Sequence, residues 1–335
     1  MVKALWGFVL VLLAWAQAAP EAVAREAVAR WLKGELSPKL EEVLRASPEE
    51  APRLLERYAL FPPPPRGLSV NLESPKREGN RVFFPAAAGE TVGEVVVLLE
   101  GEEARRVYFR PEGLSLPAYL LSPTAGWGFF LLTVFWLFLL LQPSPFRAWL
   151  SQALALLRDY RGLYLFTNLL LYGLFALGAL LAYAMPGLAR ALQVLFGGAL
   201  EAMGLEGAVE KGVLVLAGVI FHWNFSQGLL LTGLVPALLF GVPALLLNAL
   251  RYLVFGFALS PALLGSAFLA HLPTLLLELQ AYILVTFGGL VLLARVAGGK
   301  GYREGLRGLL LAFYLGALFL LLAAWYEAWE VRFLL

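Results

Sequence analysis

The longest apolar run in the chain sets the strongest limit on its fold. Residues 213–259 contain one formally charged side chain, Arg251. At about 1.5 Å per helical residue this run would extend for roughly 70 Å, more than twice the roughly 30 Å hydrocarbon core of a bilayer. The run therefore predicts two membrane-spanning helices. We place the turn between them at residues 236–243, because Pro236 and Pro243 disfavour a continuous helix there.

Further apolar segments of spanning length lie on both sides of this run. The residues are 60% hydrophobic and the mean hydropathy is +0.75, values typical of a polytopic membrane protein. We expect an all-α membrane domain over residues 124–335 with about six transmembrane helices. Residues 188–211 carry Arg190 and three glutamates, so they predict an interfacial or re-entrant segment and not a span. The other four spans are predicted at residues 125–142, 163–185, 272–294 and 309–325.

Residues 1–19 have the pattern of a secretory signal peptide. Lys3 precedes an apolar stretch, which small residues follow as at a cleavage site. The segment is either cleaved after Ala18 or Ala19 or kept as an uncleaved anchor. In both cases the next part of the chain is placed outside the cytoplasm.

The region before the first span changes its periodicity part-way. Residues 20–61 show apolar positions at helical spacing, and the prolines at residues 62–65 end this pattern. Afterwards apolar and polar side chains alternate, as at residues 68–72, and glycine turns separate the alternating segments. We expect an extracytoplasmic helical segment at residues 20–61 and a small antiparallel β domain of four or five strands at residues 62–123. The membrane domain would thus carry an N-terminal extracytoplasmic α+β domain.

Two basic loops orient the predicted spans. Loops rich in Lys and Arg remain on the cytoplasmic side, and this placement agrees with an exported N-terminal region. We therefore expect a multi-pass protein of the plasma membrane. The amphipathic residues 146–160 are expected to lie along its inner surface. The basic residues of the two loops are Arg147, Arg158 and Arg161, and Arg295, Lys300, Arg303 and Arg307.

Polar side chains inside the predicted spans form the candidate site. An ionisable group in hydrocarbon costs several kcal/mol, so it is retained where it faces protein, water or a partner. Glu278 is the first candidate, although a place near a helix end would leave it only partly buried. An ion pair with Arg251 would lock two helices, and breaking such a buried pair costs about 3–5 kcal/mol. The predicted intramembrane polar cluster is Asn224, Gln227, Asn248, Arg251, Glu278 and Gln280.

A short motif surrounds Glu278. Leu272 and Pro273 precede it and Ala281 follows it. This spacing resembles the signature of the stage II sporulation protein M family of integral membrane proteins, in which Leu-Pro-His-Gly is followed by two apolar residues, Glu and, three residues later, Ala. The resemblance extends over residues 162–329. Its other landmarks are Asn224, Asn248 and Glu327, and the chain departs from it at Thr274, Leu275 and Ala249, which stand where the family has His, Gly and Gly.

The resemblance implies a membrane scaffold or assembly protein. In spore formers, the protein that this chain resembles is a membrane anchor that assembles with cell-wall hydrolases. The expected partners are membrane lipids and either another protein or a second copy of the chain, with a cell-wall enzyme or an ATPase as candidates. The net charge of only +2 gives no reason to expect nucleic acid.

The residue inventory excludes several classes of chemistry. The chain has no cysteine, which rules out disulfides and thiolate catalysis. His271, Thr274 and Glu278 share one helix face, but two good ligands with His222 as the only other imidazole make a poor metal site. Intramembrane proteolysis needs a serine nucleophile motif or two aspartates, and Asp159 is the only aspartate. We therefore expect no enzymatic activity, no cofactor and no metal.

Transport is the alternative that the polar residues leave open. The cluster would line a cavity near the bilayer midplane, and Pro236, Pro243 and Pro273 would break helices as at transporter sites. The sequence has no evident internal repeat and no nucleotide-binding loop. The alternative is thus a permease-like subunit that works with a separate ATPase.

Overall fold

The structure is a computed structural model in which two compact units are distinguished. Residues 1–115 and 190–203 belong to the first, the sheet unit, and residues 116–189 and 204–335 to the second, the helical unit. The predicted signal peptide lies outside the described part of the chain. The structure describes residues 20–47, 49–112, 118–202 and 206–334.

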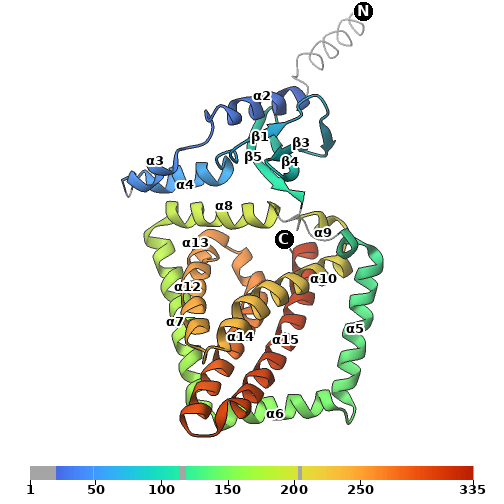
Figure 1. The fold of residues 1–335 in the computed structure, drawn as a ribbon, viewed down its shortest axis with the longest axis vertical. Coiled ribbons are helices and arrows are strands. Elements are labelled where there is room, and N and C mark those ends of the chain that lie inside the picture. The colour runs from blue at the N-terminus through green and yellow to red at the C-terminus, as the bar shows by residue number, and fades with distance from the viewer. Residues whose placement is uncertain (1–19, 48, 113–117, 203–205, 335) are drawn as a thin grey trace, which may run out of the picture. The chain divides into compact units, whose positions relative to one another are not determined.

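The sheet unit begins with three short helices and continues as a five-stranded antiparallel sheet (Figure 1). The strand order is β1-β3-β4-β5, and β2 also pairs with β3. A small N-terminal sheet was expected from the alternation of apolar residues. The elements are α2 (Pro20–Leu32), α3 (Leu40–Arg45), α4 (Ala51–Leu60), β1 (Leu68–Val70), β2 (Lys76–Glu78), β3 (Arg81–Ala88), β4 (Thr91–Glu100) and β5 (Glu103–Pro111).

Helix α2 covers one face of this sheet. Its Ala24 and Trp31 are fully buried in one cluster with Val82 and Val97, which are directly opposite each other on β3 and β4. The Trp31 indole Nε1 donates a hydrogen bond of 2.6 Å to the Pro62 carbonyl, in the proline run. The helical residues and the strands therefore share one hydrophobic core.

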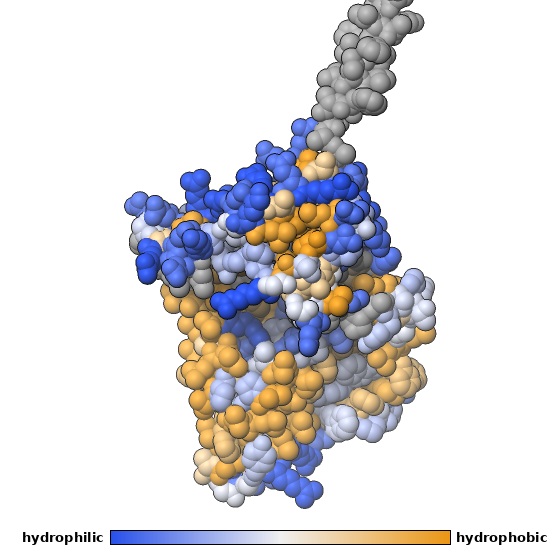
Figure 2. All heavy atoms as spheres, turned by 45° about the horizontal axis from the view of Figure 1, so that its top comes forward, coloured by the Kyte–Doolittle hydropathy of each residue, from blue (hydrophilic) through white to orange (hydrophobic). Residues whose placement is uncertain are grey.

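In the described part of the helical unit, six helical segments are long and apolar enough to cross a membrane. Each overlaps one predicted span, because length and hydropathy determine both. Figure 2 shows hydrophobic side chains over much of the helical unit on the face in view, as lipid contact requires. The segments are Pro123–Leu141 (α5), Arg161–Ala184 (α7), Val213–Ala237 (α10 Val213–Trp223, η3 Asn224–Leu234 and α11 Val235–Ala237), Val242–Leu264 (α12 Val242–Ala258 and α13 Pro261–Leu264), Ala267–Ala297 (α14) and Gly301–Phe333 (α15).

Shorter helices connect these segments. A single turn, η2 (Ala118–Leu121), precedes α5, and α6 (Pro145–Asp159) joins α5 to α7 across one end of the bundle (Figure 1). The segment predicted to be too polar to span forms α8 (Pro186–Ala202) and α9 (Glu206–Glu210), and neither has the length and hydropathy of a span.

Helices α14 and α15 form a long antiparallel hairpin at the centre of the helical unit (Figure 1). Every residue of α14 from 281 to 292 is buried, so other helices surround this part of α14. Pro273 lies inside α14 and does not end it, contrary to the expectation of a broken helix at that proline.

The third span is interrupted at the predicted polar position. Residues from Asn224 to Leu234 form a π-helix, η3, which widens the backbone within a span. Such stretches are rare and are frequent at functional sites. The following turn lies at the predicted prolines and places Phe240 and Gly241 at φ angles of 62° and 75°. A side chain at Gly241 would collide with the Gly289 backbone of α14, which explains a glycine there.

Candidate functional site

The most completely bonded carboxylate within the spans is Glu330 of α15. It is fully buried, and its Oε1 lies 2.9 Å from the Nδ1 of His271. The hydroxyl of Thr274 donates to its Oε2 at 2.8 Å. His271 and Thr274 lie one turn apart on α14, so the predicted common face exists and is directed at α15. Glu330 thus ties the two helices of the central hairpin together.

Glu278 of α14 faces two other helices. The amide Nδ2 of Asn224, the first residue of η3, donates a hydrogen bond to its Oε1. Glu327 of α15 is a close neighbour of this carboxylate. Glu278 therefore connects the π-helix to the central hairpin.

Arg251 of α12 has neutral partners. Its Nη1 donates to the Asn248 Oδ1 at 3.0 Å, and its Nη2 donates to the Thr232 hydroxyl. Its guanidinium carbon lies 4.6 Å from the centre of the Tyr282 ring, as in a cation–π contact. Among the described residues no ion pair joins Arg251 to Glu278, so the predicted lock between them is wrong. An amide, a hydroxyl and an aromatic face satisfy the guanidinium in its place.

Two more predicted residues bond across helices in separate places. Asn248 is fully buried and its Nδ2 donates to the Thr286 hydroxyl of α14 at 2.8 Å. Gln280 faces α7, where its Nε2 donates to the Tyr164 hydroxyl at 2.7 Å. The side chain of Gln227 is exposed, which separates it from the rest of the predicted cluster.

The residues of the family-like motif are placed on α14 and α15. Ala281 is fully buried, and its carbonyl oxygen lies 3.0 Å from the Cβ position of Gly316 on α15. Leu272 and Pro273 are partly buried. Thr274, which stands where the resembled family has histidine, bonds the Glu330 carboxylate. His271, one turn earlier on α14, places its imidazole on that carboxylate too.

Among the described residues of the helical unit, three side-chain oxygens are buried without a hydrogen-bond partner. They are the Ser226 Oγ on η3, the Ser260 Oγ before α13 and the Glu327 Oε2 on α15. Within the described ranges no group of three or more His, Asp or Glu side chains is arranged to hold a metal ion.

Sequence reasoning missed Glu330. The residue follows Glu327 by three positions and therefore shares its helix face, but it comes after the predicted last span. Because α15 continues to Phe333, Glu330 remains within the helix and meets His271. The spacing of the two glutamates was the signal that could have identified it.

A comparison of the chain with known protein families, with curated proteins and with solved structures finds no match. The resemblance to stage II sporulation protein M depends only on the residues named above.

Replacing Glu278 by alanine should destabilise the protein more than replacing Glu327. The first change leaves the Asn224 amide without its acceptor, at about 1–3 kcal/mol. The second removes a carboxyl group that has one unpartnered oxygen, so we expect a smaller loss. Thermal unfolding in detergent measures both. Glu278→Gln is the control because it retains an acceptor for Asn224, and equal melting temperatures of the two alanine variants would contradict this assignment.

Proposed function

We propose that this chain is a non-enzymatic integral membrane scaffold, whose N-terminal sheet unit recruits a partner outside the cytoplasm. The observation that carries the proposal is the polar network of the spans. Glu278, Glu330 and Asn248 direct their hydrogen bonds at neighbouring helices. Buried polar contacts of this kind fix helix register and packing, which a stable anchor requires.

The sheet unit supports the recruiting role. It has its own core around Trp31 and carries charged residues on its surface. Arg106 and Arg110 lie over the rings of Tyr108 and Phe83 on the face that α2 does not cover. The resemblance to a family that contains an assembly anchor agrees with this role, and the exported N-terminus that the sequence predicts would place the unit outside.

A permease-like subunit is the second candidate, and one observation favours it. Among the described residues, the Ser226 hydroxyl on the π-helix η3 and one carboxyl oxygen of Glu327 are buried without a hydrogen-bond partner. Free acceptors beside an irregular helix are a feature of solute and ion sites in membranes.

Purification of the full chain from native membranes in a mild detergent separates these candidates. We expect a second protein with an extracytoplasmic domain, or a second copy of the chain, in a stoichiometric amount. Deletion of residues 20–112 should abolish capture of that protein while the helical unit still purifies. Stoichiometric recovery of a cytoplasmic ATPase, followed by solute flux in liposomes, would replace the scaffold with the permease. A monomer without any protein partner would contradict both.

A further inference from the structure

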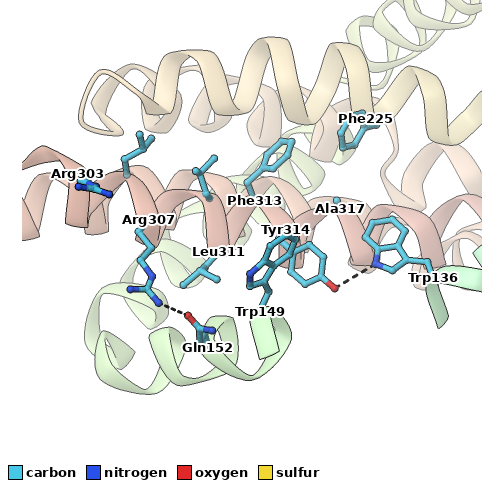
Figure 3. A pocket seen from close by; sticks show the side chains of 12 residues that line it. Trp136, Trp149, Gln152, Phe225, Arg303, Arg307, Leu311, Phe313, Tyr314 and Ala317 are labelled. Atoms are coloured by element: carbon cyan, nitrogen blue, oxygen red, sulfur yellow. Dashed lines mark hydrogen bonds between the residues drawn. The ribbon is translucent and has the colours of Figure 1, made fainter. Parts of the chain in front are cut away.

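A deep groove opens on the helical unit between α5, α6 and α15 (Figure 3). Its cavity volume is about 640 Å³. The walls are aromatic and aliphatic: Trp136 comes from α5, Trp149 from α6 and Phe313 from α15, and Phe225 of η3 lies at the inner end. Pockets that hold a small organic ligand have volumes of roughly 300–1,000 Å³, so the groove has the size of a binding site.

The two ends of the groove differ in charge. Arg303 and Arg307 lie at one end, and Trp136 and Phe225 lie toward the other (Figure 3). Both arginines are exposed, and the Arg307 Nη2 donates a hydrogen bond of 2.8 Å to the Oε1 of Gln152. In the described part of the chain no carboxylate forms an ion pair with either guanidinium. The groove therefore combines an apolar channel with a cationic end.

Acidic side chains near this end do not cancel its charge. Asp159 and Glu304 line a smaller adjoining pocket together with Arg295 and Arg307. Arg303 adds a third guanidinium on the side of the main groove. The basic groups thus outnumber the acidic ones where the groove begins.

The apolar part of the groove, beyond Arg307, is about as long as one leaflet of a bilayer is thick. Along α15 the distance from Arg307 to Ala317 is roughly 15 Å, at about 1.5 Å per residue. Half of a bilayer's hydrocarbon core is also roughly 15 Å thick. Ala317 lies midway along the apolar residues 309–325, which places the inner end of the groove near the bilayer centre.

We propose that the groove binds one anionic phospholipid, with its phosphate on Arg303 and Arg307 and an acyl chain along the aromatic wall. Basic pockets between transmembrane helices are recognised sites for anionic headgroups.

Lipid titration of the full chain in a neutral detergent, followed by native mass spectrometry, tests the proposal. We expect one phosphatidylglycerol to bind the wild type more tightly than phosphatidylcholine does. The exposed arginines permit the double variant Arg303→Gln, Arg307→Gln, which should weaken phosphatidylglycerol binding roughly 30-fold and leave phosphatidylcholine unchanged. The control Arg332→Gln changes an exposed arginine at the opposite end of α15 and should have no effect. Equal binding of the two lipids to the wild type, or an equal loss in the control, would overturn the proposal.

A second variant tests the channel independently of charge. Leu310 lines the groove and is 48% exposed, so tryptophan is tolerated there and would fill the space. Leu310→Trp should weaken phosphatidylglycerol binding about tenfold or more while its melting temperature without lipid remains that of the wild type. Unchanged phosphatidylglycerol binding in this variant would assign the affinity to surface charge alone and would overturn the role of the groove.

Discussion

Glu330→Ala is expected to lower the free energy of unfolding by about 3–5 kcal/mol. Its carboxylate is fully buried and is the partner of both the His271 imidazole and the Thr274 hydroxyl. Removing one member of a buried, bonded group leaves the others desolvated and unpaired, and this cost exceeds the value of an exposed ion pair severalfold. Thermal or denaturant unfolding of the purified protein measures the loss.

The chain offers matched controls for this experiment. Glu304→Ala changes an exposed glutamate near the other end of the same helix, and it should alter the stability little. His271→Ala should show coupling, because the double variant with Glu330→Ala loses less than the sum of the two single changes. If Glu330→Ala were as stable as Glu304→Ala, the carboxylate would not hold the hairpin together.

The second large effect is expected at the contact between α7 and α12. A Cβ atom at Gly256 would lie 2.0 Å from the Phe175 carbonyl oxygen, and one at Gly178 would lie 2.1 Å from the Leu253 carbonyl oxygen. Both obstacles are backbone atoms, so Gly256→Ala can be accommodated only by moving the helices apart. Overpacking costs about 1–3 kcal/mol and more where the backbone must shift, and we expect the upper end of this range.

Gly173→Ala on α7 is the control for the packing change. Apart from the adjacent residues and the backbone of its own helix, no described atom lies within 4 Å of its Cβ position, and alanine favours a helix by up to about 1 kcal/mol over glycine. We expect this variant to be as stable as the wild type or slightly more stable. Size-exclusion profiles and melting temperatures in one detergent compare the two variants. If Gly256→Ala had the same melting temperature as Gly173→Ala, the backbones of α7 and α12 would not be in close contact at Gly256.

The positions of the spans could be predicted because the length and hydropathy of each apolar segment determine them. The run at residues 213–259 was too long for one span, and the structure divides it into Val213–Ala237 and Val242–Leu264. The turn falls at the prolines and requires Gly241 in a left-handed conformation. Hydropathy and length identify such segments without knowledge of which helices are neighbours.

The partners of the polar residues could not be predicted, since they depend on how each helix is rotated. Opposite charge made Glu278 the obvious partner of Arg251, whereas the structure gives Arg251 an amide, the Thr232 hydroxyl and an aromatic ring. Glu278 instead accepts a hydrogen bond from Asn224, where the π-helix begins. A local change from α to π geometry redirects every following side chain, and periodicity in the sequence does not reveal it.

Only residues 298–300 separate α14 from α15. His271 and Thr274 lie on the first of these helices and Glu330 on the second, so in a bilayer their polar groups would be inserted on successive segments of the growing chain. A lone α14 would expose its imidazole to lipid, and a lone α15 would expose its carboxylate. If α14 and α15 insert as a preformed pair, neither polar group is exposed to lipid, and the free-energy cost of both exposures is avoided. The hairpin, and not the single helix, is therefore the expected unit of membrane insertion.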